Sequence, residues 1–155
     1  MCYDVTFREA TADDLTVIET LLRAAALPLE GIEAHLPGFV LAHRDQEVVG
    51  LAGTERYGAY GLLRSVTVRS DQRGQGKGQA LTSELIRRAH DAGLSGLFLL
   101  STAAERFFPK FGFTPITRGD LPPGLFASQE LQGVCPASAV VMHLALQPTQ
   151  AGIPR

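Results

Sequence analysis

The sequence predicts an α/β (α+β) protein built on one mixed, mostly antiparallel central sheet with helices on both faces. Two observations carry this prediction. Hydrophobic residues make up 45% and charged residues 19% of the 155 residues, which is the balance of a globular chain large enough for one core. Short apolar stretches of the kind that form strands are interleaved with stretches whose apolar residues recur at helical spacing.

The first half of the chain predicts a strand, a helix and three further strands. Residues 5–7 alternate like a short strand, and Thr11 with Asp14 three residues later is a typical helix start. An apolar helical face follows at Leu15, Ile18, Leu22 and Ala25. Residues 27–38 break this helix and leave room for one short helical turn. Strands are expected at 39–43, 47–58 and 59–69, with a hairpin turn at 44–46 and a tight turn at Gly58.

The second half predicts a helix, a buried strand, a short helix and two more strands, which brings the sheet to about seven strands. The long helix carries Leu81, Leu85 and Ala89 and stops near Gly93. Residues 97–100 read as a fully apolar strand, parallel to the strand before the helix because a crossover helix connects them. A short helix over 103–112 should end at Gly112, and strands should follow at 113–116 and 138–146. We expect one domain over residues 1–147 and a frayed tail over 148–155.

Composition excludes several classes of protein. The net charge of −2 gives no basic excess for nucleic acid, and no apolar run has the length of a membrane span. The N-terminus has no apolar signal region, so a cytoplasmic location is expected. Cys2 and Cys135 are too few for a disulfide framework, and the scattered histidines show no ligand spacing, so no metal is expected.

The stretch from Ser70 to Ala80, SDQRGQGKGQA, places three glycines between a predicted strand and a predicted helix. The first amides of a helix lack internal acceptors and carry partial positive charge, so a pyrophosphate binds there if side chains do not obstruct it. Lys77 is followed by Gly78 instead of Ser or Thr, which excludes the Walker motif, and the glycine spacing differs from the Rossmann pattern. A flexible turn before a helix is the alternative.

Arg73, Gly76 and Gly78 match the pattern Arg-x-x-Gly-x-Gly, which resembles the acetyl-CoA-binding loop of the GCN5-related N-acetyltransferases (GNAT). The family also carries a V-x-V-like strand end upstream and an aromatic helix end downstream. Here these are Val66-Thr67-Val68 and the residues Ala104, Phe107, Phe108, Gly112 and Phe113. The resemblance runs from about Val5 to Leu146. It implies the GNAT fold, with the sheet splayed at its parallel pair, and an N-acetyltransferase that uses acetyl-CoA as donor.

The resemblance also implies roles for individual residues. The backbone of Val66, Thr67 and Val68 would bind the pantetheine arm, and Ser101 and Thr102 would lie beside the thioester. Phe107 and Phe108 would pack on the pantetheine, with ordinary core packing as the alternative. The pyrophosphate would be held by the loop residues Arg73, Gly74, Gln75, Gly76, Lys77, Gly78 and Gln79.

Acetyl transfer to an amine needs a base, because amines are mostly protonated at pH 7. Glu55, late in its strand, is the candidate, and a solvated charge at a strand end is the alternative. Many relatives protonate the departing thiolate with a tyrosine at the position of Phe108. Here the thiolate is protonated by Ser101, Thr102, Tyr57, Tyr60 or water, or it leaves without being protonated.

The back half is similar to the acetyltransferase domain of N-acetylglutamate synthases, but Pro136 and Ala137 stand where that group has two arginines before Ser138. Glutamate therefore loses its charge partners. Over its full length the chain resembles the small acetyltransferases of arsenic-resistance operons. The expected substrate is a small amine, such as an amino acid or an analogue of one. The protein is expected to be a monomer or a homodimer. The alternatives are a protein or polyamine acetyltransferase and a non-catalytic acyl-CoA-binding module.

The substrate-binding candidates lie in three segments. Pro28 and His35 belong to a segment that resembles a lid. Arg64 interrupts an apolar strand, so it needs a partner: it either clamps a substrate carboxylate or pairs with Glu55 or another acid. Cys135 and Ser138 complete the set, although a lone cysteine is more often a small buried hydrophobe.

Overall fold

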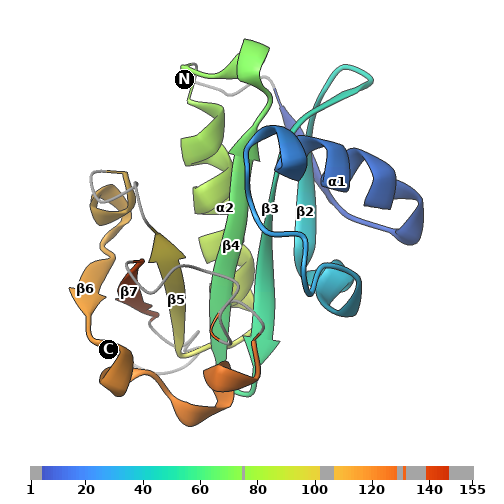
Figure 1. Ribbon diagram of the computed structural model, residues 1–155. Coiled ribbons are helices and arrows are strands. Elements are labelled where there is room, and N and C mark those ends of the chain that lie inside the picture. Colours follow the sequence, from blue (N-terminus) through green and yellow to red (C-terminus); the bar gives the residue numbers. More distant parts are fainter. Residues whose placement is uncertain (1–4, 75, 102–106, 129–130, 132–138, 147–155) are drawn as a thin grey trace. The chain divides into compact units, whose positions relative to one another are not determined.

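The computed structural model describes residues 5–74, 76–101, 107–128, 131 and 139–146. Its strands are β1 (Thr6–Glu9), β2 (Phe39–Arg44), β3 (Glu47–Tyr57), β4 (Tyr60–Val68), β5 (Gly96–Ser101), β6 (Thr114–Ile116) and β7 (Val140–Ala145), and its α-helices are α1 (Leu15–Ala24) and α2 (Lys77–Asp91) (Figure 1). They form one seven-stranded sheet in the order β1-β2-β3-β4-β5-β7-β6.

The sheet is mixed, as predicted. β4 and β5 pair in parallel, with Tyr60 opposite Gly96 and Leu62 opposite Phe98. The pairs β1–β2, β2–β3, β5–β7 and β6–β7 are antiparallel. The chain divides into two compact units, Met1–Glu55 with Leu63–Leu85 and Arg56–Leu62 with Ile86–Arg155. A single domain over residues 1–147 stays a prediction.

The predicted capping box follows β1 in the first unit. Thr11 precedes a short 3₁₀ turn, Ala12–Asp14, that leads into α1. The backbone N–H of Thr11 donates to Asp14 Oδ2 at 2.8 Å, which satisfies an amide that the helix cannot. Asp14 also accepts two hydrogen bonds from the Arg8 guanidinium, at 2.8 and 2.9 Å. These bonds favour the ionised carboxylate, and the Arg8 partner lowers the pKa of Asp14 from 3.8 to about 2.

Because the pKa of Asp14 is lower in the folded chain than in the unfolded one, the ion pair stabilises the fold above about pH 4 and is lost as the pH falls toward 2. Asp14→Asn should lower the free energy of unfolding by about 1–2 kcal/mol at pH 7, since the half-exposed Arg8 weakens the pair. The difference should shrink between pH 4 and pH 2. Urea unfolding at pH 7, 4 and 2.5 measures this, with the exposed neighbour variant Asp13→Asn as control. A difference that stays constant with pH would contradict it.

Helices cover both faces of the sheet within the first unit, as predicted. Successive residues of a strand point to opposite faces. Leu51 on β3 packs in one core cluster with Ile18 and Leu22 of α1. A Cβ added at the preceding residue, Gly50, would meet the Leu81 side chain of α2 at 2.9 Å. α1 and α2 therefore lie on opposite faces of β3.

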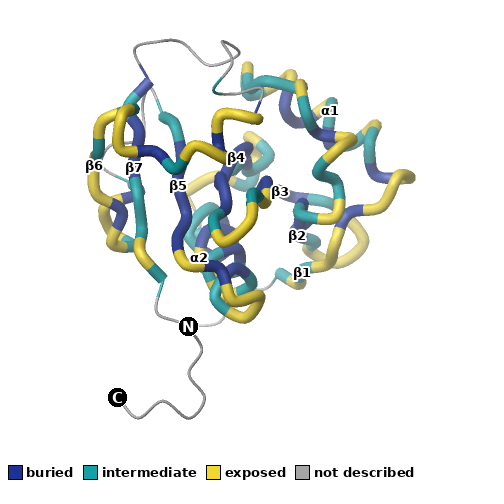
Figure 2. Tube along the Cα trace, turned by 90° about the horizontal axis from the view of Figure 1, so that it is seen from below, coloured by how far each residue is buried: buried dark blue, intermediate teal, exposed yellow. Residues whose placement is uncertain are grey.

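The second unit has its own apolar cluster, and Figure 2 shows buried residues along β5 and exposed ones in the loops. Leu62, Phe98, Leu121, Leu125 and Val141 form this cluster. β7 pairs with both β5 and β6, so the last strand lies between two strands that precede it. The sequence did not predict this insertion.

The stretch between β6 and β7 also holds 3₁₀ helices, at Arg118–Asp120 and Pro123–Ala127, that the sequence did not predict. Short 3₁₀ turns leave no apolar periodicity. Of the short helix expected over 103–112, the described part is a 3₁₀ helix, Phe108–Phe111, and Gly112 ends it with φ 100°. Across the described residues, every helix is too short or too polar to cross a lipid bilayer.

Candidate active site

The glycine loop joins β4 to α2 through a 3₁₀ turn at Ser70–Gln72. Gly74 and Gly76 both have φ +81°, a backbone conformation that favours glycine. A Cβ at Gly74 would meet nothing within 4 Å, so the loop backbone is open on that side. The helix ladder begins where Ala80 N–H donates to Gly76 O at 3.0 Å, so the amides of residues 77–79 have no acceptor inside the helix.

The two basic residues of the loop are placed differently from one another. Arg73 Nε donates to the Val68 carbonyl at 2.9 Å, which fastens the loop to the end of β4 while the residue stays exposed. Lys77 is only 4% exposed, so most of its side chain packs inside the fold instead of standing free beside the loop. Gly78 and Gln79 are half-buried in the first turn of α2, and Gln75 lies outside the described residues.

β4 bends just before its last residues. Ser65 has φ +64°, a left-handed conformation that is rare inside a strand, and its hydroxyl accepts a hydrogen bond from Arg64 Nε at 3.0 Å. Strained backbone of this kind persists where its surroundings hold it and often marks a functional site. Val66 and Val68 follow the bend and are half-buried, and Thr67 is buried. Ser65 was missed at the sequence level, because no local pattern marks a left-handed serine.

Glu55 and Arg64 form a buried ion pair across β3 and β4. Arg64 Nη1 lies 2.7 Å from Glu55 Oε2, and the two side chains are 0% and 1% exposed. Each charge compensates the other, because an isolated buried charge is very costly. Glu55 is therefore not a solvated charge at a strand end. Of the two alternatives for Arg64, pairing with Glu55 is the one that the structure contains.

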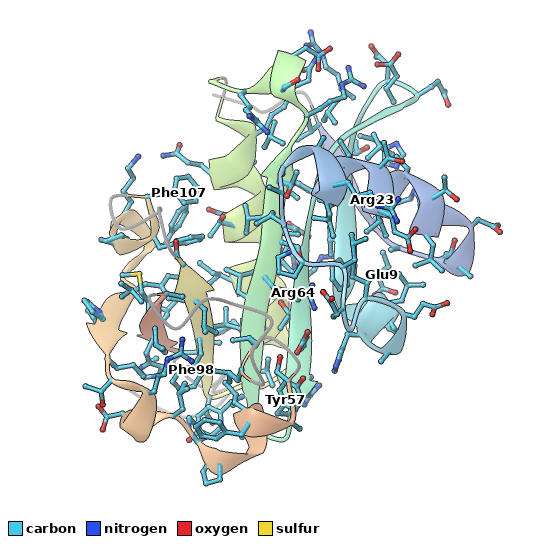
Figure 3. The ribbon with its side chains drawn as sticks, in the orientation of Figure 1. Glu9, Arg23, Tyr57, Arg64, Phe98 and Phe107 are labelled. Atoms are coloured by element: carbon cyan, nitrogen blue, oxygen red, sulfur yellow. The ribbon has the colours of Figure 1, made fainter. Side chains whose placement is uncertain are left out.

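The Arg64 guanidinium also holds the chain segment that connects α1 with β2 (Figure 3). It donates to the carbonyl oxygen of Pro28 at 2.9 Å and to that of Glu30 at 2.5 Å. The Phe39 ring lies beneath it, with 5.9 Å from ring centroid to guanidinium carbon. A side chain with these partners and no exposed surface would have to give them up to reach a substrate carboxylate, which disfavours the carboxylate clamp.

Gly31 and His35 complete this cluster. Gly31 has φ +85°, and a Cβ there would lie 3.2 Å from Arg64 Nη1 and 3.3 Å from Glu55 Oε2. The absent side chain leaves room for the ion pair, a role that the sequence did not reveal. His35 lies in the 3₁₀ segment Glu33–Gly38, with its Nε2 3.9 Å from Glu55 Oε1 and its side chain 25% exposed. The structure thus brings Glu55, Arg64, Pro28 and His35 together.

Three further predicted residues, Ser101, Phe107 and Phe108, lie in the second unit. Ser101 is half-buried at the end of β5, opposite Val140 of β7. Phe108 is 8% exposed and packs edge-on against Phe107 and Phe113, with ring centroids 5.0 and 5.8 Å apart. Phe107 is half-buried, and Lys110 Nζ lies 5.6 Å from its ring centroid. Thr102, Cys135 and Ser138 lie outside the described residues.

Among the described residues, no three His, Cys, Asp or Glu side chains are arranged to hold a metal ion.

Comparison with known proteins supports the resemblance seen in the sequence. The family model "Acetyltransferase (GNAT) domain" matches residues 36–115, just over half of the chain. An amino-acid acetyltransferase of Ralstonia nicotianae is 33% identical over 124 residues, which cover 74% of this chain and 28% of that protein. The chain thus spans little more than a quarter of the length of this curated relative.

Two solved structures share the fold. The N-acetylglutamate synthase of Neisseria gonorrhoeae, complexed with coenzyme A and N-acetyl-glutamate, matches with a TM-score of 0.81 and 22% identity over 95% of this chain and 36% of that one. The protein Rv2747 of Mycobacterium tuberculosis, in complex with CoA and NLQ, matches with a TM-score of 0.72 and 24% identity over 92% of this chain and 99% of that one. With the family match and the seven-stranded mixed sheet, the chain belongs to the GNAT acetyltransferase domain family.

Proposed function

We propose that the chain transfers an acetyl group from acetyl-CoA to the amino group of a small acceptor, an amino acid or a close analogue. The observation that carries the proposal is the open glycine loop at the start of α2. The first amides of α2 have no acceptor inside the helix, and Gly74 leaves the loop backbone accessible. These features fit the pyrophosphate of coenzyme A, which supplies the acetyl group as a reactive thioester.

Relatives support the choice of donor and acceptor. The Neisseria gonorrhoeae and Mycobacterium tuberculosis structures are both complexes with coenzyme A. The Ralstonia nicotianae relative is an amino-acid acetyltransferase. Pro136 and Ala137 take the place of the arginine pair expected for glutamate, so we propose an amino acid other than glutamate. An arsenic-resistance context stays a prediction from the sequence alone.

Glu55 is proposed as the general base. A base must be ionised before the reaction and held in one orientation. The Arg64 guanidinium, 2.7 Å away, provides both conditions by compensating the charge and fixing one carboxylate oxygen. Ser101, Thr102, Tyr57 and Tyr60 remain the candidates for protonating the departing thiolate.

A thiol-release screen tests the proposal directly. Acetyl-CoA is offered with each standard L-amino acid, with the corresponding decarboxylated amines, with polyamines and with lysine-containing peptides. We expect coenzyme A release with one or a few amino acids and little with the amines. Equal rates with amines or peptides would favour a polyamine or protein acetyltransferase. Binding of acetyl-CoA without release for any acceptor would favour a non-catalytic module.

Gly76→Asp is expected to weaken acetyl-CoA binding at least about tenfold, because it places a negative charge where the pyrophosphate should bind. Gly76→Asn adds a side chain of similar size without the charge and should weaken binding less. Gly93→Asp is the matched control, since Gly93 has the same φ of +81° as Gly76 but lies past the far end of α2. Calorimetry with acetyl-CoA measures all three. Unchanged affinity in a folded Gly76→Asp protein would remove the loop from the binding site.

A further inference from the structure

His35 stands between the buried carboxylate and solvent. Glu55 is 1% exposed, whereas the His35 side chain is 25% exposed, and their nearest polar atoms, Nε2 and Oε1, are 3.9 Å apart. The other oxygen of Glu55 accepts the Arg64 hydrogen bond at 2.7 Å. The two carboxylate oxygens therefore face different partners, one the Arg64 guanidinium and the other the His35 imidazole, a general acid and base in many proteins.

The proposed reaction releases one proton in each turnover. An amino group enters mostly as the ammonium ion, because its pKa lies above 7. It loses one proton to become a nucleophile and a second when the amide forms. The second proton ends on the sulfur of coenzyme A, and the first is released. A base that is almost completely buried must hand this proton on before the next turnover.

We propose that His35 carries this proton from Glu55 to solvent. The ammonium proton passes to the Glu55 carboxylate, the resulting carboxyl gives it to the neutral imidazole at Nε2, and the imidazolium then gives it to water. The gap of 3.9 Å exceeds a hydrogen bond, but one bridging water or a small turn of the ring closes it. This relay rests on the proposed function and on Glu55 as base.

The surroundings of His35 suit such a relay. Three groups meet at Gly31, whose Cβ position lies 3.2 Å from Arg64 Nη1, 3.3 Å from Glu55 Oε2 and 3.9 Å from His35 Cδ2. Glu55 on β3 and Arg64 on β4 are the charged groups that face the ring. The main chain of His35 is held in place, since its backbone N–H donates to the Gly31 and Ile32 carbonyls at 3.2 Å, while the ring can still turn about its side-chain bonds.

The test is His35→Gln, assayed with acetyl-CoA and the amino acid that reacts fastest among the standard twenty. We expect kcat at pH 7 to fall about ten- to hundredfold, with both KM values nearly unchanged, because proton transfer and not binding is impaired. Free imidazole added to the assay should restore the rate with a saturating dependence, and wild type should not respond. His35→Asn, a smaller replacement, should behave alike and serves if the first variant is unstable.

His43→Gln is the matched control, because His43 lies on β2 of the same unit beside Arg8 and should show neither loss nor rescue. An unchanged kcat in the His35 variants would overturn the relay. So would a loss accompanied by higher KM values and no response to imidazole, which points to a packing role. If Glu55→Gln abolishes activity while His35→Gln does not, the relay alone fails. If wild type acetylates no acceptor, the proposed function fails as well.

Discussion

Replacing Glu55 with glutamine is expected to lower kcat by about two to four orders of magnitude at pH 7, because general bases contribute on that scale. The amide keeps the size of the side chain and its hydrogen bond from Arg64, but it cannot take a proton. Acetyl-CoA affinity should be unchanged, since the glycine loop is untouched. Steady-state kinetics with the preferred amino acid and calorimetry with acetyl-CoA provide the two measurements.

Glu47→Gln is the matched control for this experiment. Glu47 lies on the same strand, but its side chain is 67% exposed and pairs with Arg69 on the surface. The kcat of the Glu47→Gln enzyme should match that of the wild type. A Glu55→Gln enzyme within a few-fold of the wild-type rate at every pH would show that another group, or bulk water, removes the proton.

Arg64→Met is expected to lower the free energy of unfolding by about 3–5 kcal/mol, the usual result of removing one partner from a buried ion pair. The methionine leaves the Glu55 carboxylate uncompensated, and it leaves the carbonyls of Pro28 and Glu30 without the donors that now reach them at 2.9 and 2.5 Å. Guanidinium chloride unfolding, monitored by circular dichroism, measures this change in the free energy of unfolding.

A double variant separates the charge from the packing. The loss of unfolding free energy in the double variant, Arg64→Met with Glu55→Gln, should be smaller than the sum of the losses in the two single variants. The reason is that Glu55→Gln removes the buried charge that Arg64→Met leaves without a partner. Arg23→Met, on an exposed arginine of α1, should leave the unfolding midpoint nearly unchanged. Strict additivity of the two changes would mean that the pair contributes little, and that Arg64 acts through its backbone partners.

Local signals explain what the sequence predicted well. The capping box of Thr11 and Asp14, the hairpin turns and the glycines at helix ends act over a few residues, so they can be read without the fold. Arg64 was expected to need a partner because it interrupts an apolar strand, and Glu55 was a candidate base because it lies late in a strand, where the resembling family carries its base. Which of the possible partners Arg64 would take depended on pairing between β3 and β4, which no local pattern fixes.

Long-range packing explains what was missed. The carbonyl partners of Arg64 lie more than thirty positions away along the chain, at Pro28 and Glu30. The need for a glycine at position 31 arises only because the ion pair occupies the space beside it. The insertion of β7 between β5 and β6 likewise depends on which edges of the sheet remain to be paired, and the strand sequences themselves do not record it.

Arg64 holds the segment after α1 through hydrogen bonds to main-chain carbonyl oxygens, which every amino acid has. The exposed side chains of that segment are therefore free to change without detaching it, whereas Gly31 and the buried Ile32 are fixed by their surroundings. Glu30, Glu33 and Ala34 are exposed there. Of these three residues, Glu30 bonds to Arg64, and it does so through its backbone carbonyl. If this segment contacts the acceptor, new acceptor preferences can be selected by varying these positions, while the carboxylate of Glu55 stays where it is. The attachment thus separates the evolution of specificity from the upkeep of the fold.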